Sequence, residues 1–242
     1  MKKFLILFLV VSSTISVAQE SVLLRLKYKK GDVYSIKMNQ SINSPAMMMG
    51  MNIDMGMSVL SVDKNVYTSE MKISKMTMDM MQGGMQMSYD STQKEEDLDE
   101  MGKMMSAQMS PMLKVVITAK TNDLGKNLET KVEPNMPNAE QFGSRGSVAY
   151  PEKAVKVGDT WTDEKEAQGM KTAMEYKVTK ITKDKVFLEV SGKITGAGTG
   201  TTNGTLEIER SSGIPLKSLI KSNVNASGQE MKVEVTLTMT KK

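Results

Sequence analysis

The chain has 242 residues, a formal net charge of +4, 25 methionines, and neither histidine nor cysteine. Without histidine and cysteine, Ser-His-Asp and Cys-His catalytic centres, the common zinc sites and disulfides are excluded. Aromatic residues make up only 5% of the chain, and there is no basic stripe with interleaved aromatics of the kind that a nucleic-acid binder usually shows. We therefore expect no enzyme activity, no cofactor and no nucleic-acid partner.

Residues 1–18 have the pattern of a secretory signal peptide. Lys2 and Lys3 precede an apolar run, and Ser16 and Ala18 are the small residues of a cleavage site. The segment is too short to span a membrane, and no later stretch approaches about 20 apolar residues. A lipid anchor attached to a cysteine after the cut is impossible here. The mature protein is expected to be exported to the periplasm or outside the cell, with no lipid anchor and no stable membrane span.

The first strands are predicted from alternating polarity. Weak alternation over 21–28 and stronger alternation over 33–42 predict two strands separated by a turn at Gly31-Asp32. Nineteen of the 25 methionines then follow between Met38 and Met112. Apolar residues occupy every odd position of the next segment: Met47, Met49, Met51, Ile53, Met55, Met57 and Val59. A period of two predicts a strand with one face covered by thioethers.

The return strand is predicted over 66–81. Its parity slips between Ile73 and Met76, which predicts a β-bulge near Lys75. The Gln82-Gly83-Gly84 sequence predicts a hairpin, after which alternation resumes from Met85.

One amphipathic helix is predicted next. Residues 92–95 fit a capping box, and the acidic residues that follow favour a helix N-terminus. Apolar residues then recur at spacings of three and four, at Leu98, Met101, Met105, Met109 and Met112. The helix is expected to end near Ser110-Pro111.

The rest of the chain predicts further strands. They are expected over 115–120, 128–132, 174–181, 186–190, 206–209, 216–224 and 231–239. The Pro-, Asn- and Gly-rich segment 133–146 predicts a long loop, and 196–204 a Gly/Thr turn region.

Two sequence echoes relate the parts on either side of this loop. Residues 30–35 resemble 157–162, and Met55, Met57 and Val59 match Met174, Tyr176 and Val178 at a constant offset. Either duplication or convergent hairpin chemistry explains them. The chain is expected to be a single β-rich domain over 19–242, with two halves, 19–132 and 147–242, joined by 133–146. The fold class is mainly β: a curved antiparallel sheet or half-barrel of two related halves, with one amphipathic helix packed on the concave face.

Several short motifs carry a resemblance to known proteins. They are Lys30 to Tyr34, Tyr89-Asp90-Ser91 before the helix, Asn122 to Gly125, and Val155 to Trp161. Together they resemble an uncharacterised Bacteroidota family of exported β-rich proteins. The wider likeness is to half-barrels of the lipoprotein-carrier type, in which a curved sheet wraps a helix over an apolar concavity. The resemblance implies a fold and an exported location, and no chemistry; the methionine density of this chain departs from it.

The methionines admit several interpretations. They can form the sheet core, line an apolar binding concavity, bind a soft metal such as Cu(I) or Ag(I), or be sacrificed to oxidants. We favour the concavity, holding a lipid, another apolar small molecule or a protein segment. Its candidate lining is Met47, Met49, Met51, Met55, Met57, Met76, Met78, Met85, Met87, Met101, Met105 and Met109. The candidate soft-metal ligands of the alternative are Met101, Met104, Met105 and Met109.

Overall fold

The computed structural model describes residues 20–135, 148–167, 169–226 and 228–242. The expected signal peptide and most of the expected loop 133–146 lie outside these residues. Seven strands precede the loop: β1 (Ser21–Val22), β2 (Val33–Asn43), β3 (Met47–Asp63), β4 (Val66–Gln82), β5 (Met85–Asp90), β6 (Val116–Asn122) and β7 (Asn127–Glu133). Seven follow it: β8 (Val155–Lys156), β9 (Thr160–Ala167), β10 (Met170–Ile181), β11 (Lys185–Gly196), β12 (Thr199–Glu209), β13 (Pro215–Ala226) and β14 (Gln229–Lys241).

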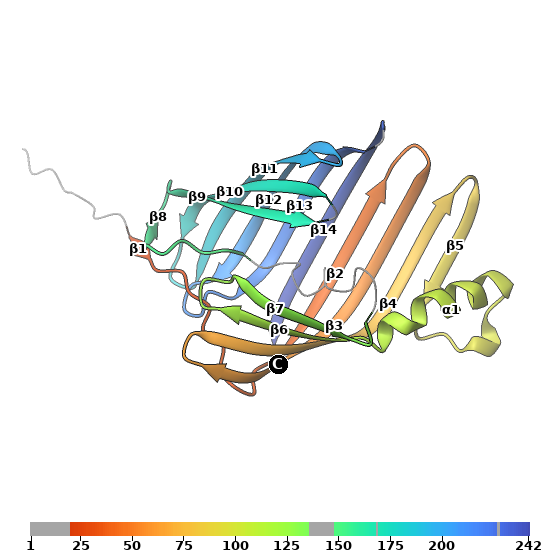
Figure 1. Cartoon of the computed structure of the whole chain (residues 1–242), viewed down its shortest axis with the longest axis horizontal. Helices are drawn as coiled ribbons and strands as arrows, with labels where there is room; N and C mark the ends of the chain where they lie inside the picture. The colour runs from red at the N-terminus through yellow and green to blue at the C-terminus, as the bar shows by residue number, and fades with distance from the viewer. Residues whose placement is uncertain (1–19, 136–147, 168, 227) are drawn as a thin grey trace, which may run out of the picture.

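Twelve of these strands form one antiparallel sheet. Its order is β7-β6-β4-β3-β2-β14-β13-β12-β11-β10-β9, with β5 paired to β4 alongside β6. The sheet curls so that β6 and β7 at one end, and β9 and β10 at the other, lie in front of the long central strands (Figure 1). The two ends of this order do not pair with each other, so the sheet stays open. The predicted mainly β, antiparallel fold with one α-helix is confirmed for the described residues.

The predicted features of β3 and β4 are also confirmed. The odd positions of β3 from 51 to 59 are buried, whereas the even positions face outward. Pairing between β3 and β4 skips Ser74, one residue from the expected bulge at Lys75. Gly83 and Gly84 both have positive φ, as a tight turn between β4 and β5 requires.

The Gly-Asp motif before β2 forms a hydrogen-bonded turn. The Asp32 carboxylate accepts from the Lys29 backbone N–H at 3.0 Å. The N–H of Gly31 donates to the Val59 carbonyl at 2.9 Å, and the Val59 N–H donates back to the Asp32 carbonyl at 2.9 Å. The turn is therefore fixed both by its own carboxylate and by β3.

The same arrangement recurs before β9. The Asp159 carboxylate accepts from the Lys156 N–H at 3.0 Å, while Gly158 and Asp159 exchange hydrogen bonds of 2.8 and 2.9 Å with Val178. One residue after each valine, at Leu60 and at Thr179, the strand bulges. The echo in the sequence thus corresponds to a repeated local structure in which Val178 takes the place that Val59 has in the first half.

Two segments outside the twelve-stranded sheet, 22–28 and 148–155, contribute side chains to the lining of the core cavity; we call them the straps. They meet where β1 pairs with β8. The Leu26 N–H donates to the Asp123 carbonyl and the Tyr150 N–H to the Leu124 carbonyl, each at 2.8 Å. The predicted strand over 21–28 is thus confined to Ser21–Val22, because the rest of the segment bonds to turns rather than to a neighbouring strand.

A turn glycine makes room for each strap. A Cβ added at Gly125 would lie 2.0 Å from the Val148 carbonyl oxygen, and one added at Gly213 would lie 2.2 Å from that of Arg25. Both glycines have positive φ, 77° and 66°. Each half therefore docks its strap against a glycine turn of the other half.

The expected start of the helix was wrong. A 3-10 turn (Glu95–Asp97) occupies the expected start of the helix, and α1 (Glu100–Leu113) is capped by Asp99, whose carboxylate accepts from the Gly102 N–H at 2.7 Å.

The Gly/Thr region expected as a turn is mostly strand β12. A Cβ at Gly200 or Gly204 would lie 2.1 Å from a backbone oxygen of β13, so glycine permits these strands to approach closely.

Candidate functional site

The inner face of β3, β4 and β5 is defined by their pairing. Met51 lies opposite Met78, and Met78 lies opposite Tyr89. Residues directly opposite each other in antiparallel strands share a face, and all three are buried. Their neighbours along each strand are more exposed and form the outer face.

Helix α1 covers part of this inner face. It contacts β4 and β5, and its Met105 is only 4% exposed. Met76 and Met78 of β4 are likewise buried. The expectation that the helix packs on the concave face is confirmed, although its apolar stripe is not wholly covered: Met109 is half-buried and Met101 is 38% exposed.

Beyond the helix, towards the Gly83-Gly84 turn, no element within the described ranges packs over the inner face. Met49 lies opposite Met80, and Met80 lies opposite Met87, so three half-buried methionines cross three adjacent strands. Met47 is also half-buried, and Met85 is 60% exposed. We call Met47, Met49, Met80, Met85 and Met87 the inner methionine surface.

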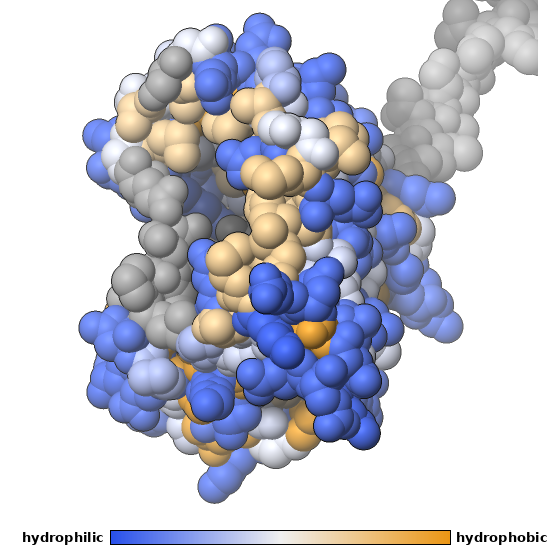
Figure 2. All heavy atoms as spheres, turned by 90° about the vertical axis from the view of Figure 1, so that its right-hand side faces the viewer, coloured by the Kyte–Doolittle hydropathy of each residue, from blue (hydrophilic) through white to orange (hydrophobic). Residues whose placement is uncertain are grey.

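The outer face at the same end carries a second, smaller apolar feature. Met48 and Met81 lie opposite each other and are 53% and 49% exposed. Separate from this outer pair, Met101 and Met104 are exposed on α1, which covers part of the inner face. Viewed from the α1 side, moderately hydrophobic side chains form a band along this end of the molecule (Figure 2).

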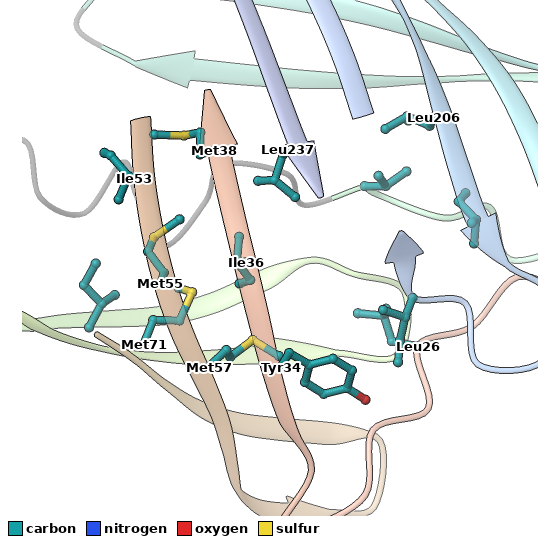
Figure 3. Packing of buried hydrophobic residues seen from close by; sticks show 14 of the residues in the cluster. Leu26, Tyr34, Ile36, Met38, Ile53, Met55, Met57, Met71, Leu206 and Leu237 are labelled. Atoms are coloured by element: carbon teal, nitrogen blue, oxygen red, sulfur yellow. The ribbon is translucent and has the colours of Figure 1, made fainter. Parts of the chain in front are cut away.

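The middle of β3 belongs to the closed core instead. Met55 and Met57 are each 5% exposed and lie opposite Ile36 and Tyr34 of β2, with Met71 of β4 beside them (Figure 3). They border a cavity of about 90 Å³ that both straps help to enclose. Pockets for drug-sized ligands occupy about 300–1,000 Å³. This cavity is therefore too small for a lipid.

The twelve candidate lining residues thus fall into two groups. Six are core residues in the structure: Met51, Met55, Met57, Met76, Met78 and Met105. Six are half-buried or exposed: Met47, Met49, Met85, Met87, Met101 and Met109. Met80 was not among the candidates. The sequence pattern could have identified it, because Met80 continues the alternation of Met76 and Met78 after the bulge.

The four candidate soft-metal ligands have unlike surroundings. Met101 and Met104 are exposed, Met109 is half-buried and Met105 is buried. Within the described ranges, no cluster of His, Cys, Asp or Glu has the arrangement of a metal site.

The aromatic and charged groups near the straps hold the fold together. Tyr28 packs edge-to-face on Tyr34 and Tyr67, with ring centroids 5.5 Å apart in both pairs. Burial opposes ionisation of Asp32, but hydrogen bonds from Lys241, the Lys29 backbone and Tyr34 outweigh it and hold the pKa of this carboxyl below its usual value. Among the described residues, no buried side-chain nitrogen or oxygen lacks a hydrogen-bond partner. These polar groups are engaged in structural bonds.

The second half of the chain matches a known family model. Residues 144–242 match a family described as a family of unknown function, DUF6263. The match confirms the coarser expectation, a resemblance to a family without an assigned function; the Bacteroidota origin and the exported location of that family stay predictions. The comparison with curated proteins finds no match. Within the part of the chain that the structure describes, no helix is long and apolar enough to cross a membrane.

One solved structure, titled "Lipid-protein interactions in lipovitellin", shares the fold. Its TM-score is 0.58 at 11% sequence identity, over 89% of this chain and 25% of the other. The chain therefore spans about a quarter of the length of that protein's chain. At this identity the likeness is one of fold alone: the described part of this chain is a large, open antiparallel sheet similar to one found in lipovitellin.

Proposed function

We propose that the protein is an exported, non-catalytic binding protein that holds an apolar ligand, of the lipid acyl-chain class, on the inner methionine surface. One observation carries the proposal. The inner face of β3–β5 continues from buried Met51 and Met78 to half-buried Met49, Met80 and Met87 with no change in residue type. A face that leaves the core and stays apolar is prepared to receive an apolar partner.

The residue type supports the same conclusion. Methionine is unbranched and polarizable, and it adapts to varied apolar shapes, which suits a surface that accepts flexible chains. In the part of the chain that the structure describes, this end of the sheet also has room for a ligand longer than the core cavity. The fold likeness to lipovitellin, whose structure is titled for lipid–protein interactions, adds support.

A titration with a fluorescent fatty acid, cis-parinaric acid, tests the proposal. The inner variant carries Met49→Asp and Met87→Asp, and the matched outer variant carries Met48→Asp and Met81→Asp. Both variants receive two charges at the same end of the sheet, on opposite faces. We expect the wild type and the outer variant to bind the probe and the inner variant to lose binding. Absence of binding by the wild type, or equal loss in both variants, would contradict the proposal.

A further inference from the structure

The methionines of this chain differ sharply in their access to solvent. Met38 and Met76 are 0% exposed, and Met55 and Met57 are 5% exposed. Five others in the described ranges are exposed by more than a third: Met48 (53%), Met81 (49%), Met85 (60%), Met101 (38%) and Met104 (57%). All five lie on β3, β4, β5 or α1. The methionines therefore fall into a set that is protected from solvent and a set that solvent can reach.

We propose that these five exposed methionines are oxidation sites, and that sulfoxide formation at Met85, Met101 and Met104 lowers the affinity for the apolar ligand. The second part rests on the proposed function. The oxidant is a peroxide. The thioether sulfur attacks one peroxide oxygen, the O–O bond breaks, and an S–O bond forms. With hydrogen peroxide the sulfur is oxidised by two electrons, the attacked oxygen loses its proton, and the other oxygen takes up that proton and leaves as water.

The position of each sulfur decides the consequence of oxidation. A sulfoxide is polar, and it converts a flexible apolar side chain into one that prefers water. Met85 belongs to the inner methionine surface, and Met101 and Met104 lie on the helix that contacts β5. Placing a sulfoxide against an apolar chain leaves its oxygen without a hydrogen-bond partner, which is unfavourable.

The fold should survive the same reaction. The exposed sulfurs already face solvent, so a polar group there requires no burial. The core methionines, such as Met38 and Met76, are shielded. Oxidation should therefore change what the surface binds before it changes whether the protein is folded.

The outer face provides an internal control. Met48 and Met81 are as accessible as the inner and helical sites, but they lie on the opposite side of the sheet. They should be oxidised at comparable rates with no consequence for binding.

The experiment treats the mature protein with limiting hydrogen peroxide. Peptide mass spectrometry locates the sulfoxides, thermal unfolding monitors the fold, and cis-parinaric acid titration measures binding. One variant carries Met85→Leu, Met101→Leu and Met104→Leu; the other carries Met48→Leu and Met81→Leu. Each protein is compared with itself before and after peroxide.

We expect the five exposed methionines to be oxidised first, and the affinity of the wild type to fall about tenfold or more. The outer variant should lose affinity as the wild type does, and the triple variant should be resistant. Early oxidation of Met38 or Met76 would overturn the assignment of sites. Unchanged binding after oxidation of the exposed set would overturn only the regulation, whereas absence of binding before peroxide would overturn the proposed function and the regulation with it.

Discussion

Truncation of Met55 and of Met80 should separate the core from the binding surface. Both lie on the inner face, but Met55 is 5% exposed whereas Met80 is half-buried at the open end. Replacing a core methionine with alanine costs about 2–5 kcal/mol. Because Met55 already borders a cavity of about 90 Å³, truncation of its side chain enlarges an existing void. We expect Met55→Ala to cost about 3 kcal/mol, and Met80→Ala less than about 1 kcal/mol.

Urea unfolding gives these free energies, and thermal unfolding gives a second measure. In a chain of this size, a cost of about 3 kcal/mol should lower Tm by about 6–12 °C. Binding of cis-parinaric acid, measured on the folded protein, should weaken in Met80→Ala and change little in Met55→Ala. The reasoning would be refuted if Met55→Ala cost less than about 1 kcal/mol and abolished binding, since Met55 would then be a wall of the ligand site.

Four further results are expected. Met55→Asp should destabilise the fold strongly because it buries an unpaired charge, whereas Asp54→Met, on the outer face, should be nearly silent in the same urea assay. Gly125→Ala should destabilise more than Gly84→Ala, because both glycines have positive φ but only Gly125 has a strap carbonyl in the way; equal effects would deny that the strap docks there. The pKa of Asp32 is lowered in the folded state, so its contribution to stability is present above its ordinary pKa of about 3.9 and is lost as the pH falls through the folded value. Urea midpoints at acidic pH should therefore fall more in the wild type than in Asp32→Asn. The apo protein should not take up a defined number of Cu(I) equivalents in competition with a weak chelator, because the four helical methionines have unlike surroundings; stoichiometric uptake would favour the soft-metal alternative.

Local features of the fold could be predicted because short sequence patterns determine them. The period of two in β3 and the Gly83-Gly84 turn each depend on a few neighbouring residues, and both occur where expected. The bulge lies at Ser74, next to the predicted Lys75, for the same reason. The start of α1 was less predictable because two capping sequences lie close together: residues 92–95 fit a capping box, but Asp99 caps the helix.

The division between core and surface methionines could not be predicted from alternation. Met49 and Met55 occupy equivalent positions on one strand face, but only Met55 is enclosed. The difference arises from the straps, which reach this region through contacts such as that between Gly125 and Val148, distant in sequence. The alternation of odd and even positions therefore identified which side chains face inward. It could not show how far along each strand the inner face is covered.

Methyl NMR of the mature protein labelled with [methyl-13C]methionine tests the central claim most directly. Each methionine gives one methyl signal, which can be assigned by single Met→Leu substitutions. On titration with oleate, we predict that the signals of Met47, Met49, Met80, Met85 and Met87 shift together and saturate, while those of Met38, Met55 and the outer pair Met48 and Met81 stay in place. If no methyl signal moved, or if the core or outer signals moved instead of the inner set, the inner methionine surface would not be the ligand site.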